Sequence, residues 1–137
     1  MLEKWQNVHH RKNLDQMLAH LPIIDREHLN ECGIDEDLFR ELSAIYIEQT
    51  PAIIVDIKNQ MNVGKTDCLR KLAHNLKGTS ANLGAARMAE LSRMIERSTA
   101  ADSPLELRHL ITCLDKEFQE TAFVMQNVKQ PTDGIAA

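Results

Sequence analysis

The sequence predicts an all-α fold, an up-down antiparallel four-helix bundle with accessory N-terminal helices. Apolar residues recur at intervals of three and four along several segments, which is the spacing of one face of an α-helix. No segment alternates apolar and polar residues with the period of two that marks a half-buried strand. Only five glycines and four prolines are available for turns, and short links between helices favour antiparallel neighbours.

The size and composition restrict the class of protein. The 137 residues are enough for one domain with a real core, and the net charge of −4 argues against general nucleic-acid binding. No apolar run approaches the length of a membrane span, and Glu3 and Lys4 interrupt the N-terminus where a signal peptide would be apolar. Three widely spaced cysteines favour reduced thiols and form no metal-binding pair. We expect a cytoplasmic protein without membrane insertion, nucleic-acid partner or metal.

The N-terminal third contains accessory elements. Residues 1–21 form a polar lead-in with a partial apolar stripe, which either caps the domain or is a linker retained from a longer chain. Pro22 ends this lead-in. Asp25 can N-cap a short helical turn that Gly33 closes, and Asp35 can N-cap the next helix.

Four further segments are expected to form the bundle. Their predicted helices begin at Pro51, Lys65, Ala85 and Pro104. Thr50-Pro51 combines a capping threonine with proline at the first helical position, and residues 103–106 form a capping box with proline at the same position. Gly64 and Gly84 end the first two helices, and the helix from Asp35 would extend or cover one end of the bundle. The predicted organisation is a lead-in or linker helix over 1–21, a domain over 22–129 and a loose tail over 130–137.

Residues 73–84, in the second bundle helix, carry the unusual chemistry. On a helical wheel with about 100° per residue, the apolar residues of this helix fall on one side and His74 falls nearly opposite, toward solvent. The residues around His74 on this outer face are Arg70, Lys71, Lys77, Gly78 and Ala81. A glycine inside a helix costs about 1 kcal/mol relative to alanine, so stability does not explain this composition.

This outer face suits phosphoryl transfer from a protein. A neutral imidazole is a capable nucleophile, and the cations around His74 are charge-assisted donors for a phosphoryl group. Lys77, one turn on, can reach the oxygens of a phosphorylated imidazole, while Gly78 and Ala81 leave a flat spot for another protein. No nucleotide loop is predicted, because residues 64–66 lack both the earlier glycine and the preceding strand of a phosphate-binding loop.

This stretch resembles the signature of the histidine-containing phosphotransfer (HPt) domains of bacterial multistep phosphorelays. That signature is His-x-Leu-Lys-Gly-[Ser/Thr/Ala]-x-x-x-Leu-Gly, usually preceded by alanine, and residues 73–84 match it in full. The resemblance covers roughly residues 22–127. It implies a four-helix bundle with accessory helices, in which His74 carries a phosphoryl group on an imidazole nitrogen. The donor would be a phospho-aspartate of a receiver domain, as in a hybrid sensor kinase, and the recipient a receiver aspartate of a response regulator.

The resemblance also implies roles for neighbouring residues. Lys77 would be the counter-charge of the phosphoryl group, and Glu96 occupies a position near the histidine where the family often has glutamine. We expect Glu96 to pair with Lys77 rather than to touch the phosphoryl group. The expected partner-binding residues are Arg70, Lys71, Gly78 and Ala81. No cofactor is implied in this chain, since the Mg²⁺ for transfer would lie in the partner's receiver domain, and no ATP-dependent kinase activity of its own is expected.

Two other functions stay open at this point. One is the dimerisation and phosphoacceptor region of a histidine kinase, although Asn75 and Pro104 do not fit the Glu and nearby proline typical of that family. The other is a helical adaptor whose basic face binds an acidic partner without chemistry. We expect a monomer, because the chain has enough helices for its own bundle. Since residues 2–5 are similar to the final helix of some receiver domains, the chain is either free-standing or a piece of a hybrid kinase.

Overall fold

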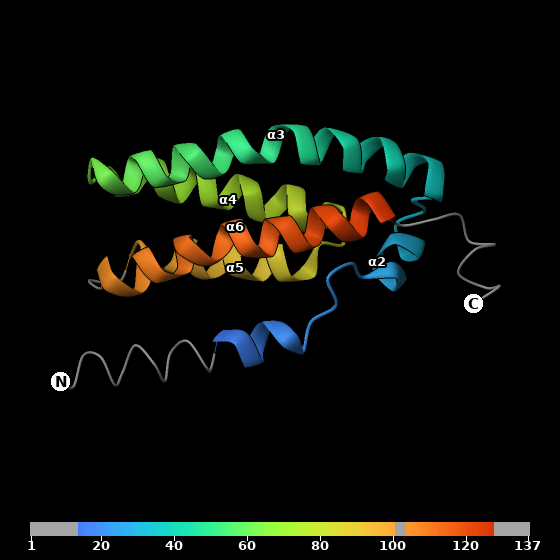
Figure 1. Ribbon diagram of the computed structural model, residues 1–137, viewed down its shortest axis with the longest axis horizontal. Coiled ribbons are helices and arrows are strands. Elements are labelled where there is room, and N and C mark those ends of the chain that lie inside the picture. The colour runs from blue at the N-terminus through green and yellow to red at the C-terminus, as the bar shows by residue number, and fades with distance from the viewer. Residues whose placement is uncertain (1–13, 101–103, 128–137) are drawn as a thin grey trace.

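A computed structural model describes residues 14–100 and 104–127, and these residues form helices and connections without any strand (Figure 1). The helices are α2 (Arg26–Glu31), α3 (Glu36–Asn62), α4 (Thr66–Asn82), α5 (Ala86–Ser98) and α6 (Pro104–Asn127). Residues 14–19 form a further helical segment ahead of α2. The helices α3 to α6 run antiparallel to their neighbours, and contacts between α3 and α6 close the bundle. The predicted all-α four-helix bundle is confirmed.

Local signals in the sequence explain most helix boundaries. Asp25 accepts a hydrogen bond from the backbone N–H of His28 at 3.1 Å, and Asp35 accepts one from that of Leu38 at 2.8 Å, so both are N-caps as predicted. The helix α6 begins at Pro104, where proline needs no hydrogen-bond donor. These signals mark where α2, α3 and α6 begin, whereas α4 and α5 begin without a side-chain cap.

The prediction of a helix start at Thr50-Pro51 is wrong. The helix α3 is a single helix of 27 residues that contains Pro51. Its buried residues keep a helical spacing across the proline: Phe39, Ser43, Tyr46, Thr50, Ile54 and Ile57. This continuous stripe packs on the core and offsets the cost of an internal proline, which is about 3 kcal/mol. The helix expected to cover one end is therefore the first half of α3, a bundle helix.

The core lies between the inward stripes of the four bundle helices. Its fully buried large apolar residues are Ile57, Leu69, Leu76, Met88, Leu91, Ile95 and Leu114. The hydroxyl groups of Tyr46 and Ser80 form a buried hydrogen bond of 2.7 Å between α3 and α4. Burial raises the pKa of Tyr46 to about 12, so this phenol stays protonated and keeps its polar partner. The bond adds a polar contact to the apolar packing of α4 against α3.

The described part of the lead-in packs on the bundle. Leu14 and Leu18 are buried members of the hydrophobic core, and Nε of Arg87 donates to the carbonyl oxygen of Leu21 at 2.7 Å. The helical segment 14–19 therefore covers the bundle, while the predicted domain boundary at residue 21 stays a prediction. Three predicted features lie outside the described residues: the start of the lead-in (1–13), the capping serine at 103 and the tail (130–137).

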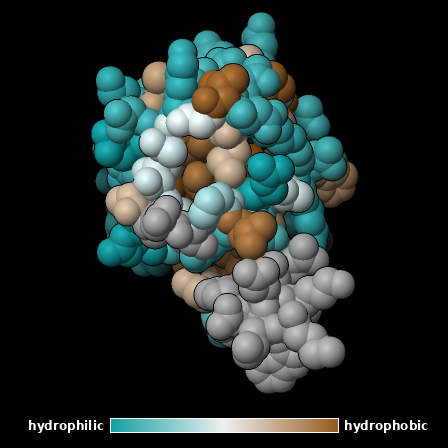
Figure 2. Space-filling view, turned by 90° about the vertical axis from the view of Figure 1, so that its left-hand side faces the viewer, coloured by the Kyte–Doolittle hydropathy of each residue, from teal (hydrophilic) through white to brown (hydrophobic). Residues whose placement is uncertain are grey.

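The end of the bundle where α3 meets α4 is viewed in Figure 2. Hydrophilic residues make up most of the surface seen there, and hydrophobic residues show in its middle and at a few places nearer the edge. This arrangement follows from helices whose apolar stripes face inward. None of the helices in the described ranges is both long enough and apolar enough to span a membrane.

Candidate functional site

His74 lies in the middle of α4, on the face directed away from the core. The buried residues of this helix are Leu69, Ala73, Leu76 and Ser80, which agrees with the inner side of the predicted wheel. The side chain of His74 is 61% exposed. Packing of its inner face on the core holds α4 in place, so the helix presents the imidazole to solvent on a rigid support.

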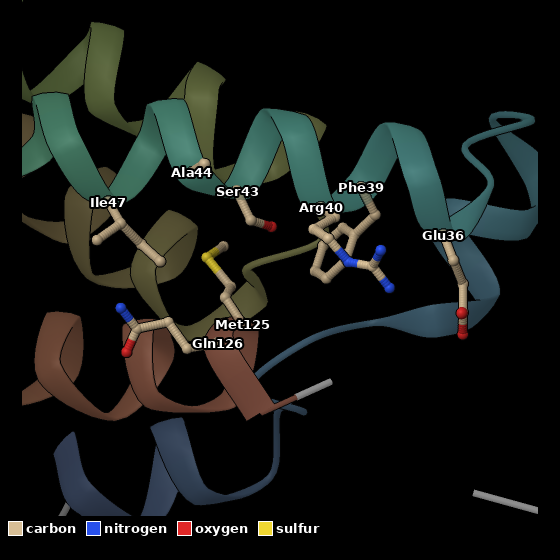
Figure 3. Close-up of a pocket in the computed structure, with 8 residues that line it drawn as sticks. All are labelled: Glu36, Phe39, Arg40, Ser43, Ala44, Ile47, Met125 and Gln126. Carbon is tan, nitrogen blue, oxygen red and sulfur yellow. The ribbon is translucent and has the colours of Figure 1, made fainter. Parts of the chain in front are cut away.

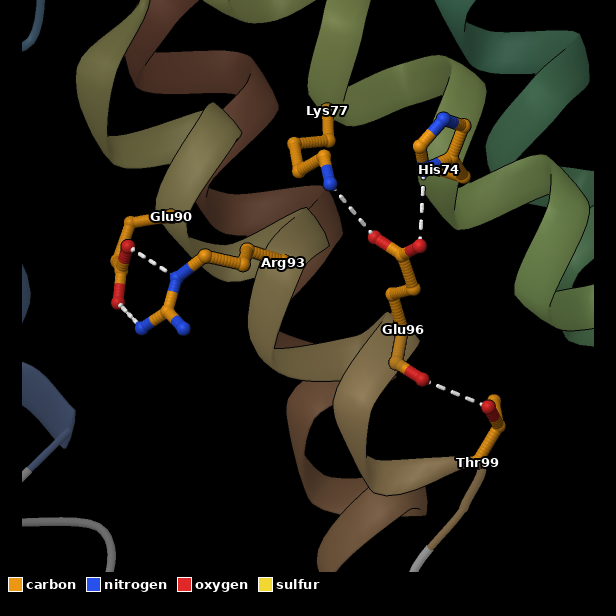
Figure 4. A network of polar contacts seen from close by, with 6 residues as sticks. All are labelled: His74, Lys77, Glu90, Arg93, Glu96 and Thr99. Atoms are coloured by element: carbon orange, nitrogen blue, oxygen red, sulfur yellow. Dashed lines mark hydrogen bonds and ion pairs between the residues drawn. The ribbon is translucent and has the colours of Figure 1, made fainter.

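One carboxylate, that of Glu96 in α5, contacts both His74 and Lys77 (Figure 4). Its Oε1 lies 2.8 Å from Nδ1 of His74, and its Oε2 accepts a hydrogen bond from Nζ of Lys77 at 2.9 Å. The hydrogen bond from Lys77, with a smaller contribution from that of His74, lowers the pKa of Glu96 below its usual value. The expected pair of Glu96 with Lys77 is therefore present, and the direct contact of Glu96 with the imidazole is an additional finding.

The contact with Glu96 selects one tautomer of His74. An ionised carboxylate can only accept hydrogen bonds, so Nδ1 of His74 carries the proton that points at Glu96. In the neutral ring the other nitrogen, Nε2, then carries a lone pair. Since the side chain is mostly exposed, a partner from solution can approach Nε2. The arrangement is therefore that of a nucleophilic nitrogen, Nε2, on a ring that a carboxylate orients through Nδ1.

Arg93 of α5 is a cation near the site that the sequence analysis missed. It lies one turn before Glu96 and binds Glu90 in a bidentate pair, with Nε donating to Oε2 at 2.8 Å (Figure 4). The i,i+3 spacings from Glu90 to Arg93 and from Arg93 to Glu96 place all three on one helix face. This spacing is visible in the sequence, but it points to the site only once the face of α5 that meets α4 is known.

The predicted partner-binding residues share the outer face of α4 with His74. Arg70, Lys71, Gly78 and Ala81 are all exposed. Arg70 is paired with Asp67 at 3.3 Å, so this face is a mixture of acids and bases rather than a purely basic surface. This ion pair argues against the adaptor hypothesis, because an adaptor for an acidic partner would need a purely basic face.

Gly78 borders open space on this face. A Cβ atom built at Gly78 would meet no atom within 4 Å, in contrast to one at Gly84. The described chain therefore supplies no packing reason for glycine at position 78.

Two hollows lie on different sides of the bundle. One, of about 310 Å³, adjoins the site and is lined by residues that include Lys77, Ala81, Arg93 and His28. The other, of about 320 Å³, lies between α3 and the end of α6 (Figure 3), and none of its lining residues belongs to α4 or α5. The second hollow is therefore separate from the His74 site. Within the described ranges, no group of three or more His, Cys, Asp or Glu side chains is placed to hold a metal ion.

Comparison with protein families matches most of the bundle. The family model of the Hpt domain matches residues 41–120, which is 80 of the 137 residues. The matched range runs from α3 into α6 and includes His74, Lys77 and Glu96. Neither the search of curated proteins nor the search of solved structures gave a match. On the bundle and the family match together, this chain belongs to the Hpt domain family, whose members act in phosphotransfer within phosphorelay signalling.

Proposed function

We propose that this chain accepts a phosphoryl group on His74 from the aspartate of one receiver domain and passes it to the receiver aspartate of a response regulator. The observation that carries the proposal is the shared carboxylate of Glu96, which holds Nδ1 of His74 and Nζ of Lys77 at 2.8 and 2.9 Å. A surface histidine without chemistry has no need of an oriented tautomer with a cation beside it.

Uptake is a displacement at phosphorus. Nε2 of His74 attacks the phosphorus of the donor's aspartyl phosphate, and a bond from Nε2 to phosphorus forms as the bond to the aspartyl oxygen breaks. The electron pair of the broken bond leaves with the donor's carboxylate. Nδ1 keeps its proton throughout, and the carboxylate of Glu96 stabilises the positive charge that the ring acquires.

Lys77 provides the counter-charge for the transferred group. An ammonium group has three donors, and one of them is directed to Glu96. The remaining donors are available to phosphoryl oxygens, and charge-assisted hydrogen bonds of this kind are the strong ones. Because Lys77 lies three residues after His74 on the same helix, its ammonium is held beside the imidazole.

The partner would dock on the outer face of α4. The receiver must bring its aspartate into contact with His74, and the open space at Gly78 allows a close approach of the two backbones. Arg70, Lys71 and Ala81 would form the rest of the contact. The Mg²⁺ for transfer would belong to the receiver. One chain supplies all four bundle helices, which supports a monomer rather than the two-chain bundle of a kinase dimerisation region.

The test is phosphoryl transfer from a panel of receiver domains that have been phosphorylated with acetyl phosphate. We expect acid-labile phosphate on the wild-type chain and none on His74→Gln. The matched control is His20→Gln, which removes another exposed histidine and is expected to accept phosphate like the wild type. Phosphate on His74→Gln would refute the role of His74. A wild-type chain that binds receivers without taking up phosphate would instead establish the adaptor.

A further inference from the structure

Glu96 has a consequence for the step in which His74 gives its phosphoryl group away. We infer that Glu96 keeps a proton on Nδ1 of phosphorylated His74, so that the leaving group in phosphoryl donation is a neutral imidazole even above neutral pH. Glu96 is in this sense a positioning residue that acts through His74. The inference rests on the proposed function, and it assigns to the carboxylate of Glu96 a task that a neutral amide at this position would perform less well.

The position of one proton decides how readily the phosphoryl group is donated. The acceptor's aspartate oxygen attacks phosphorus, the bond from Nε2 to phosphorus breaks, and its electron pair returns to Nε2. If Nδ1 carries a proton, the departing group is a neutral imidazole. If Nδ1 has lost its proton, the departing group is an imidazolate, which is a far stronger base and therefore a far poorer leaving group. Phosphorylated His74 thus transfers well only while Nδ1 is protonated.

The charges around the ring favour this proton through Glu96 and oppose it through Lys77. Oε1 of Glu96 lies 2.8 Å from Nδ1, whereas Nζ of Lys77 is bound to the other oxygen of the same carboxylate at 2.9 Å. The negative charge therefore lies between the ring and the cation. An opposite charge this close typically shifts a titration by about one to three pH units.

Of the other charged groups on this face, Lys71 makes no hydrogen bond or ion pair with His74 or Glu96 among the described residues, and two arginines are engaged elsewhere. Arg70 on α4 is paired with Asp67 at 3.3 Å, and Arg93 on α5 is paired with Glu90. Among the described residues, no side chain of α3 or α6 makes a hydrogen bond or ion pair with His74. Glu96 and Lys77 are therefore the charged groups joined to the ring by hydrogen bonds, and Lys71 adds a more distant positive charge that E96Q leaves unchanged.

Replacing Glu96 with glutamine separates its charge from its shape. The amide oxygen of E96Q can still accept a hydrogen bond from Nδ1, but the ammonium of Lys77 then has no compensating charge. We expect E96Q to donate its phosphoryl group well at low pH and to lose this ability at a lower pH than the wild type does as the pH rises. E96D, which keeps the carboxylate, is expected to restore much of the wild-type profile.

The matched control is E90Q. Glu90 lies on the same helix and is also part of an ion pair, but its partner is Arg93 and it makes no contact with His74. Removing its charge therefore tests for a general effect of charge on α5. We expect E90Q to follow the wild-type pH profile.

The experiment starts from chains phosphorylated by a receiver domain and then purified. Donation to excess Mg²⁺-loaded receiver is timed from about pH 6 to about pH 9, a range that brackets imidazole titration. The ratio of each variant to the wild type removes the receiver's own pH dependence. In parallel, ¹⁵N NMR of the phosphorylated chains reports the protonation of Nδ1 directly, without any receiver. We expect the kinetic profile and the NMR titration of E96Q to move together to lower pH.

Two results would overturn different claims. If E96Q takes phosphate on His74 but both its profile and its titration coincide with those of the wild type, the inference on Glu96 fails while the proposed function stands. If the wild-type chain takes no phosphate on His74, the proposed function itself fails, and the inference on Glu96 fails with it.

Discussion

Two glycines near the end of α4 serve opposite purposes. Gly84 has a φ of +70°, and a Cβ atom there would lie 2.8 Å from the carbonyl oxygen of Asp25. Gly84 also accepts a backbone hydrogen bond from the N–H of Asp25 at 2.7 Å. Gly78, six residues earlier, lies inside the helix, is exposed, and would meet nothing within 4 Å if it carried a Cβ.

The contrast separates a glycine that the fold requires from one that the described fold leaves unexplained. Gly84 is explained within the chain, because only glycine fits both its backbone angle and its neighbour. Gly78 costs about 1 kcal/mol of helix stability relative to alanine, and no described neighbour accounts for it. The proposed docking surface for a receiver domain would account for it.

The largest expected effect is that of Gly84→Ala. Alanine at a positive φ costs about 1 to 2 kcal/mol, and the contact with the backbone of Asp25 forces a further shift of the segment before α2. We expect the free energy of unfolding in urea to fall by about 2 kcal/mol or more. The folded fraction should still accept phosphate on His74. A loss below about 0.5 kcal/mol would show that this connection adapts freely and that Gly84 is not fixed by the fold.

The sequence predicted the parts of the structure that depend on local signals. We could predict the caps at Asp25 and Asp35 and the inward-facing stripe of α4, because each depends on neighbours within one or two helical turns. The start predicted at Pro51 was wrong, since the apolar stripe stays in phase across the proline and tertiary packing keeps one helix. Local signals alone do not reveal how two distant segments share one face of the core.

The candidate site also has a part that local signals predict and a part that depends on how helices pack. The outward direction of His74 follows from the helical wheel alone, and the pair of Lys77 with Glu96 was expected. The hydrogen bond from His74 to Glu96 joins residues 22 positions apart, and it depends on the register of α4 against α5. That register is set by packing across the core rather than by any local pattern. The place of Arg93 was missed for the same reason.

The second expected effect is a loss of transfer in Gly78→Gln. A long side chain at this position fills the space in which the partner would approach, so we expect the KM for a phosphorylated receiver to rise about tenfold, equivalent to about 1.4 kcal/mol. Stability should stay level or increase, because glutamine is a better helix former than glycine.

The matched control for this change is Gly78→Ala. A single methyl group is expected to raise the free energy of unfolding by about 0.5 to 1 kcal/mol and to disturb transfer less than glutamine does. Gly78→Gln with a wild-type KM would contradict the docking surface and leave Gly78 unexplained. Steady-state transfer kinetics and urea unfolding on the same samples measure both quantities.

Two glutamates extend the comparison from glycine to charge. Glu96 accepts hydrogen bonds from Lys77 and His74, which lower its pKa. Glu117 of α6 is only 7% exposed, and its Oε1 has no hydrogen-bond partner among the described residues. Burial, with a smaller contribution from the charge of Glu120, raises the pKa of Glu117. The negative charge of Glu96 is thus stabilised by its partners in the site, whereas a negative charge on Glu117 destabilises the fold.

The smallest expected effect is therefore a gain in stability for Glu117→Gln. Because the pKa of Glu117 is raised in the folded state, the unfolded chain releases this proton first as the pH rises, and stability falls through that window. Above the folded-state value the cost is constant, and below the ordinary value for glutamate it is absent. We expect Glu117→Gln to be more stable than the wild type by about 1 kcal/mol at neutral pH, with the gain disappearing toward about pH 4. Urea unfolding at both pH values, with the exposed Glu41→Gln as control, measures it. An equal gain in stability at both pH values would show that Glu117→Gln acts through the shape of the side chain rather than through its charge.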